Sequence, residues 1–148
     1  MAQNLFPVFD VPEITTPAAA AERKYRPSVY FDFDLGDFRR DGAGNMVQAD
    51  GREAYKQWCL KVCMTERFTC LSYTTDIGTE MIGVLSQADR AAVESALERT
   101  INEALMVNPK TEYVRNFTFS WENEDLHCTF DVKGQDWEEQ TLTLTIPR

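Results

Sequence analysis

Apolar and polar residues alternate along the last third of the chain, a pattern typical of β-strands with one buried face. Three such segments run from Tyr113 to Trp121, from Leu126 to Val132 and from Thr141 to Ile146. Polar turns at 122–124 and 133–136 separate them. We therefore expect a three-stranded antiparallel meander, because short polar connections join neighbouring antiparallel strands. The residues expected on the apolar face of its first strand are Tyr113, Phe117, Phe119 and Trp121.

A fourth alternating segment begins near Val29 and predicts a strand over 29–35. Its apolar positions are Val29, Phe31, Phe33 and Leu35, and its polar ones include Asp32 and Asp34. The turn sequence at 41–45 contains two glycines and predicts a reversal, after which 46–47 forms a short return strand.

Apolar residues at helical spacing predict two long helices packed on the apolar face of this sheet. Asp50 caps the first, which runs to about Met64, and Ser86 or Asp89 starts the second, which Asn108-Pro109 ends. Between them we expect an extended segment at 68–73 and a short helix at 76–82. The fold class is α+β, with a mostly antiparallel sheet of about four strands and two to three helices on one face.

The first 28 residues differ in composition from the rest and predict an extended N-terminal arm ahead of a single domain at 29–148. They contain four of the six prolines, which remove backbone donors and favour extended conformations. A floppy chain end is one interpretation, and an arm that docks on a neighbouring subunit is the other. Large apolar residues favour docking, because disordered tails usually lack them. These residues are Leu5, Phe6, Val8, Phe9, Val11 and Ile14.

Charge narrows the classes of partner. The net charge of −9 disfavours nucleic acid and anionic membranes, because both require concentrated positive charge. The longest apolar run is the four alanines at 18–21, which is far short of the ~20 residues of a membrane span. No secretory signal is visible at the N-terminus, so we expect the cysteines to be reduced thiols. They are Cys59, Cys63, Cys70 and Cys128.

Candidate chemistry is sparse. The single histidine, His127, falls on the face opposite Leu126 and Cys128, and no serine or cysteine is placed to work with it as a nucleophile. Cys59 and Cys63 have a spacing that suits zinc, but both belong to an apolar helix stripe, which favours buried thiols. No phosphate loop or dinucleotide motif is present, and no carboxylate pair stands out. We expect no catalytic residues, no metal and no cofactor.

Several short motifs resemble a known family. They are Phe31-Asp32-Phe33-Asp34-Leu35-Gly36-Asp37-Phe38, Asp50-Gly51, Ala54, Trp58, Thr65-Glu66-Arg67, Tyr73, and Asp76-Ile77-Gly78-Thr79-Glu80-Met81. Together they resemble the baseplate sheath initiators of contractile phage tails and tailocins, in the branch found in PBSX-like prophages. The wider family has often carried the label "lysozyme-like". In that family a Glu-Arg pair precedes an aromatic-Gly step. Glu66, Arg67 and Gly78 match the pair and the glycine, whereas Ile77 replaces the aromatic residue. We expect these three residues to form a structural cluster.

The resemblance implies a structural protein that links the baseplate wedge or hub to the sheath and starts sheath assembly by strand addition. It implies a location in the baseplate of a tail particle assembled in the bacterial cytoplasm, in multiple copies, with sheath, wedge, hub or tube-initiator proteins as partners. A peptidoglycan-degrading enzyme and an unrelated cytosolic binding module are the alternatives. The two candidate docking edges are the strand at 29–35 and the last strand. We favour the last strand because it carries no charge, whereas edges that must stay unpaired usually do. Its residues are Thr141, Leu142, Thr143, Leu144, Thr145 and Ile146.

Overall fold

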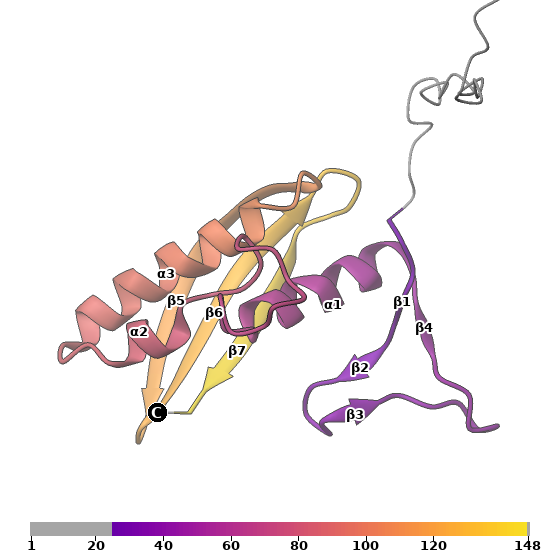
Figure 1. The fold of residues 1–148 in the computed structure, drawn as a ribbon, viewed down its shortest axis with the longest axis horizontal. Coiled ribbons are helices and arrows are strands. Elements are labelled where there is room, and N and C mark those ends of the chain that lie inside the picture. Colours follow the sequence, from indigo (N-terminus) through magenta and orange to yellow (C-terminus); the bar gives the residue numbers. More distant parts are fainter. Residues whose placement is uncertain (1–24, 148) are drawn as a thin grey trace, which may run out of the picture.

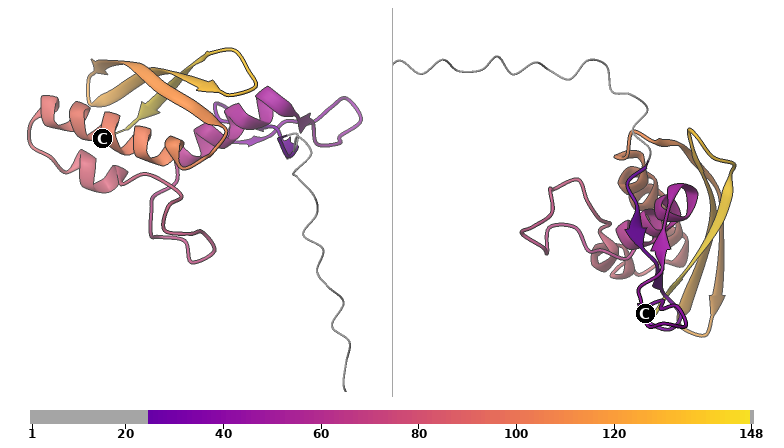
Figure 2. Two further views of the ribbon diagram at one scale, coloured as in Figure 1. Left: turned by 90° about the horizontal axis from the view of Figure 1, so that it is seen from above. Right: turned by 90° about the vertical axis from the view of Figure 1, so that its right-hand side faces the viewer.

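The computed structural model describes residues 25–147, and these fold as a three-stranded antiparallel sheet with helices on one face (Figures 1 and 2). The sheet is the predicted meander and consists of β5 (Thr111–Glu122), β6 (Asp125–Gly134) and β7 (Gln140–Ile146). The helices are α1 (Gly51–Cys63), α2 (Met81–Leu85) and α3 (Arg90–Met106). The α+β prediction is confirmed. None of the helices in this described part is long and apolar enough to cross a membrane.

The core lies between the sheet and the two long helices. Leu126, Cys128 and Phe130 of the central strand β6 are each 0% exposed, because every second residue of a strand faces the helices. From α3 the same layer receives Leu97 and Ile101, one helical turn apart, also at 0%. The apolar faces that alternation and helical spacing predicted for β6, β7 and α3 are thus the faces that pack.

The first strand of the meander departs from the prediction at Asn116. Asn116 adopts a left-handed backbone with φ of 58°, and the pairing register between β5 and β6 shifts there. Such a bulge inserts an extra residue and reverses which side chains face the core. Phe117, Phe119 and Trp121 pack on the core as expected, but Tyr113 lies on the other face, where the Arg115 guanidinium stacks on its ring.

The predicted strand at 29–35 is wrong in extent. It is reduced to β1 (Ser28–Val29) and β2 (Phe31–Asp32), which pair with β4 (Gln48–Ala49) and β3 (Asp37–Phe38) in two short hairpin ladders. The Asp32 carboxylate accepts the amides of Asp34 and Leu35, each at 3.1 Å, so the chain turns where alternation predicted a strand. Leu35 is consequently 80% exposed. This hairpin, residues 28–49, stands apart from the main sheet, which therefore has three strands and not four (Figure 1).

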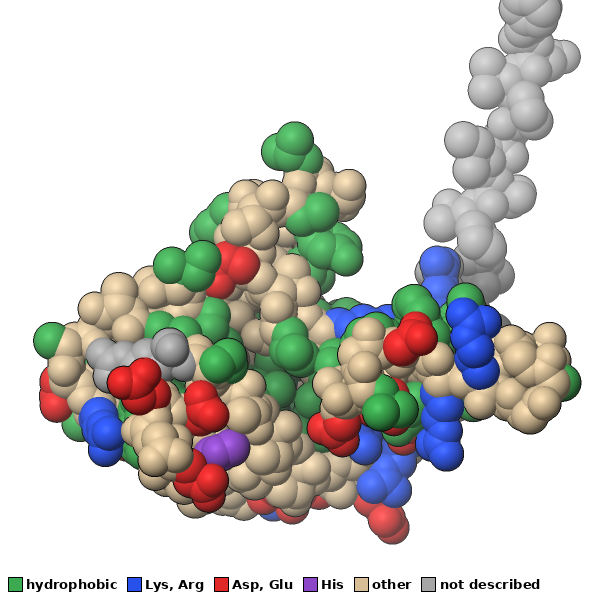
Figure 3. Space-filling model, turned by 90° about the horizontal axis from the view of Figure 1, so that it is seen from below, with side chains coloured by type: hydrophobic (Ala, Val, Ile, Leu, Met, Phe, Trp, Pro, Cys, Tyr) green, Lys and Arg blue, Asp and Glu red, His purple; other side chains and the backbone are tan. Residues whose placement is uncertain are grey.

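Two predictions between the long helices are also wrong. Residues 68–73 form turns and not an extended strand, in a loop that projects from the helical side of the molecule (Figure 2). Apolar side chains gather on this projection (Figure 3), where Leu71 and Phe68 are largely exposed. The short helix runs over 81–85 and not 76–82, because Thr79 and its neighbours bond to the end of α1 instead.

The last residues of the predicted arm belong to the folded body. The Tyr25 ring packs edge-on against the rings of Tyr55 and Trp137, with centroids 5.7 and 5.5 Å apart. Its hydroxyl accepts a hydrogen bond from the Asn108 side chain at 3.4 Å. The six apolar residues predicted to dock, from Leu5 to Ile14, lie outside the described residues.

Candidate functional site: the free edge of the sheet

Strand β7 is the outer strand of the sheet and pairs with β6 alone within residues 25–147. Its side chains alternate strictly between buried and exposed. Leu142, Leu144 and Ile146 are between 2% and 7% exposed, while the three threonines between them point outward. The opposite edge strand, β5, differs because it carries charged residues and a bulge, both of which discourage pairing. The uncharged edge of the sheet is therefore β7.

The direction of the β7 backbone groups follows from the hairpin that joins β5 and β6. Glu122 pairs with Asp125 across a two-residue turn, and such a turn closes on a pair that exchanges both backbone hydrogen bonds. Asp125 therefore directs its N–H and C=O toward β5. The direction alternates along an antiparallel strand, so Leu126 and every second residue after it direct theirs toward β7.

The pairing of β6 with β7 runs without a register shift from Leu126↔Ile146 to Val132↔Gln140. The leucines, Ile146 and Gln140 thus return the hydrogen bonds of β6. Thr141, Thr143 and Thr145 direct their N–H and C=O away from β6, toward the free edge. Side-chain spacing agrees, because pairs that exchange no backbone bonds hold their side chains closer: the Thr129 and Thr143 hydroxyl oxygens are 3.1 Å apart.

A groove of about 520 Å³ runs along this edge. One wall is β7 up to Pro147, the other is the hairpin segment Tyr30–Asp34, and α1 with Met81 closes the inner side. Figure 3 shows the hollow between the hairpin and the rest of the molecule. The hairpin is held to α1 by Gln57, which is 2% exposed and whose side-chain oxygen accepts the Phe31 amide at 3.2 Å.

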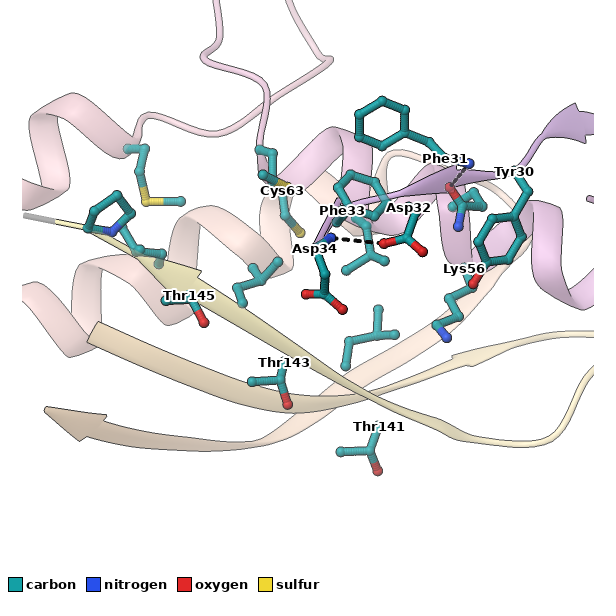
Figure 4. A pocket seen from close by; sticks show the side chains of 18 residues that line it. Tyr30, Phe31, Asp32, Phe33, Asp34, Lys56, Cys63, Thr141, Thr143 and Thr145 are labelled. Carbon is teal, nitrogen blue, oxygen red and sulfur yellow. Dashed lines mark hydrogen bonds between the residues drawn. The ribbon is translucent and has the colours of Figure 1, made fainter. Parts of the chain in front are cut away.

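The groove carries few charges. Asp32 and Asp34 lie on the hairpin wall and Lys56 on α1. Figure 4 shows the Asp34 side chain directed into the space between the hairpin and β7, and Lys56 near Tyr30. The groove is otherwise lined by apolar side chains and threonines, with a row of outward backbone donors and acceptors on one wall. This arrangement suits an extended peptide segment and contains no group poised for covalent chemistry.

The structure brings Glu66, Arg67 and Gly78 together at the end of α1. The Arg67 amide donates to the Thr79 carbonyl at 2.8 Å, and the Thr79 amide donates to the Thr65 carbonyl at 2.9 Å. The Arg67 side chain, 12% exposed, donates to the Gly78 carbonyl at 3.1 Å and lies 3.5 Å from the Glu80 carboxylate. The Glu66 carboxylate accepts the Ile82 amide at 3.3 Å, near the start of α2.

Gly78 is required in this cluster by both conformation and space. Its φ is +106°, and a Cβ there would lie 2.6 Å from the Thr65 carbonyl oxygen. Thr79 completes the connection, because its buried hydroxyl donates to the Cys63 carbonyl at 3.0 Å and so satisfies a C-terminal carbonyl of α1. We call residues 65–67 and 78–80 the clamp. Its contacts fix the two ends of the projecting loop.

The cysteines and the histidine offer no reactive arrangement. Burial raises the pKa of the Cys59 and Cys128 thiols to about 12, and that of Cys63 is also raised by burial. Cys70 is exposed on the projecting loop. His127 bonds to the Thr145 hydroxyl and lies 3.7 Å from the Glu122 carboxylate on the outer face of the sheet. Within residues 25–147, no three potential ligands gather to hold a metal ion.

The family model of the contractile injection system sheath initiators matches residues 28–136. The chain belongs to this family. The match includes the hairpin, the three helices and the clamp, and ends just before β7. No curated protein sequence matches the chain. Membership gives the chain a structural role, in a family that is not an enzyme family, and a place in the baseplate of a contractile particle, where it meets sheath and baseplate components.

Sequence reasoning missed the groove. Alternation identified β7, but the second wall forms because the hairpin folds back across α1, where the Gln57 side chain accepts the Phe31 amide. Gln57 lies in α1 and is 2% exposed. The only signal for it is its position beside the apolar stripe, where a long polar side chain can reach an unpaired backbone amide.

Proposed function

We propose that this sheath initiator attaches the first sheath ring by adding a strand of a sheath subunit to the free edge of β7. The observation that carries the proposal is the row of outward backbone groups on Thr141, Thr143 and Thr145, beside a groove that already has a second wall. Strand addition gains affinity from backbone hydrogen bonds and register from alternating side-chain contacts. The uncharged sequence of β7 supports pairing, because protected edges carry charge or proline.

The groove supports the same function because it has a second wall. An open edge without a second wall would accept any exposed strand and would promote aggregation. Here the hairpin stands across from β7, so a segment that pairs with β7 must also fit against the Tyr30–Asp34 wall. Other surfaces, including the N-terminal arm, then bind the baseplate proteins.

The test is a proline at Thr143. Because the Thr143 amide points away from β6, Thr143→Pro removes one outward donor and keeps the hydrogen bonds of the meander. We expect a folded protein whose baseplates bear few sheaths in electron micrographs. Thr143→Val is the matched control, since it keeps the amide and replaces only the hydroxyl by a methyl group, and its baseplates should bear sheaths at wild-type frequency. Full sheaths on a folded Thr143→Pro protein would show that β7 is not the docking edge.

We further propose that the apolar N-terminal arm docks on a neighbouring baseplate protein. The support is the apolar content of residues 5–14, since ordering a segment costs roughly 1–2 kcal/mol per residue and needs a partner surface. Deletion of residues 2–24 leaves Tyr25 in place and should lower the yield of assembled baseplates. A yield of assembled baseplates equal to that of wild type would show that the arm does not dock.

A further inference from the structure

We propose that the strand received by the β7 groove alternates apolar with small polar residues and carries a lysine or arginine that faces Asp34. This inference rests on the proposed strand addition and goes beyond it, because it specifies the sequence class of the partner segment. The walls of the groove supply the argument in three steps.

The alternation follows from pleat geometry. Neighbouring residues on adjacent strands point to the same face of a sheet. A residue opposite Leu142 or Leu144 therefore points inward, toward the apolar side of the groove formed by Leu60, Cys63 and Met81. A residue opposite a threonine points to the outer face, where the pairs Thr118↔Thr129 and Thr129↔Thr143 already form a row of hydroxyls. The incoming segment should continue both rows.

The basic residue follows from the unused carboxylate of Asp34. On the hairpin wall, one carboxylate oxygen of Asp32 accepts hydrogen bonds from two backbone amides of its own turn. The Asp34 carboxylate makes no hydrogen bond or ion pair with any residue of the described part, and it points into the groove (Figure 4). A strand inserted between the two walls brings its side chains next to this carboxylate. A cation there gains a charge-assisted hydrogen bond, whereas an acidic residue is repelled.

The same carboxylates explain how an open, uncharged edge avoids pairing with a second copy of itself. The strand most available to β7 is the β7 of another molecule, and its sequence Gln140–Ile146 contains no basic residue. It offers Asp34 no cation and would remove that carboxylate from water without an opposite charge beside it, which is unfavourable. Lys56, at the Tyr30 end of the groove, adds a preference for orientation, because a basic residue at that end would be repelled (Figure 4).

The experiment measures binding of the full chain to the purified, unassembled sheath subunit of the same particle by calorimetry at two salt concentrations. Asp34→Asn should weaken binding about 2–5-fold, as expected for one partly exposed charge pair, and should reduce the salt dependence. Asp34→Lys should weaken it at least tenfold. Asp37→Asn is the matched control, because Asp37 lies on the same hairpin outside the groove lining, and it should bind within twofold of wild type.

Thr143→Pro is the fourth variant in the series and separates the two proposals. If Thr143→Pro abolishes binding while both Asp34 variants bind like Asp37→Asn, strand addition stands and the charge inference is overturned. If Thr143→Pro binds like wild type, strand addition fails, and the sequence class argued from it fails as well. Rescue of Asp34→Lys by a single Lys→Glu or Arg→Glu change in the sheath subunit would identify the basic residue.

Discussion

Replacing Gly78 by alanine tests the clamp, because this glycine is needed for two separate reasons. A φ of +106° is disfavoured for alanine, and such backbone strain costs about 1–3 kcal/mol. The new Cβ would also lie 2.6 Å from the Thr65 carbonyl oxygen and 3.1 Å from the Arg67 nitrogen, both backbone atoms of the opposite side of the clamp. Relief of that contact must separate residues 78–79 from 65–67, and each backbone hydrogen bond lost there is worth about 1 kcal/mol.

Together these contributions predict that Gly78→Ala lowers the free energy of unfolding by about 3 kcal/mol, which for a chain of this size lowers Tm by about 10 °C. Thermal and urea unfolding followed by circular dichroism measure the change. Gly83→Ala is the control, because an alanine Cβ there meets no atom within 4 Å and Gly83 lies inside α2. It should raise stability by up to about 1 kcal/mol. Equal melting points for Gly78→Ala and wild type would refute the reasoning about the clamp.

Three further predictions concern side chains. Arg67→Ala should lower the free energy of unfolding in urea by about 1–3 kcal/mol, because it leaves the Gly78 carbonyl without its donor. Glu80→Gln changes an exposed carboxylate and should alter the free energy of unfolding by less than about 0.5 kcal/mol, so equal effects of the two variants would contradict this assignment. Iodoacetamide at pH 8 should modify Cys70 alone in the native protein, as mass spectrometry would show, and labelling of a second thiol would contradict the described core. The free energy of unfolding should fall as the pH rises above about 9. Thiols of the unfolded chain ionise near pH 9.0, whereas burial raises the pKa of Cys59 and Cys128 to about 12 in the folded state. A free energy of unfolding that stays constant from pH 9 to 11 would argue against the burial of these two thiols.

The elements that sequence patterns predicted well are those in which one periodicity extends over many residues. α3 and β6 each present a continuous apolar face to the same core, so the local pattern and the tertiary environment agree. The segment at 29–35 shows the same alternation over fewer residues. There the strand ends at Asp32, because the Asp32 carboxylate accepts hydrogen bonds from two backbone amides and the chain turns. The bulge at Asn116 likewise turned Tyr113 outward, and Val114 packs against the core in its place.

Some features of the candidate site could likewise be predicted from the sequence, and others could not. The free edge could be predicted because β7 is uncharged and comes last in a meander, and Gly78 could be expected near Glu66-Arg67 only through a family resemblance. The groove could not be predicted, because its second wall comes from a hairpin more than a hundred residues away in the chain, whose contacts with α1 include the Phe31–Gln57 hydrogen bond. Asp34 lies opposite β7 only because of that packing, and the sequence around Asp34 or around β7 does not indicate it.

Residue-resolved amide hydrogen exchange of the sheath initiator, free and bound to sheath subunits, tests strand addition most directly. In the free protein the amides of Leu142 and Leu144 should exchange slowly, because they donate to β6, while those of Thr141, Thr143 and Thr145 exchange fast. Binding of sheath subunits should slow the three threonine amides by at least tenfold and leave the leucine amides unchanged. Threonine amides that exchange equally fast in the free and sheath-bound protein would contradict the account.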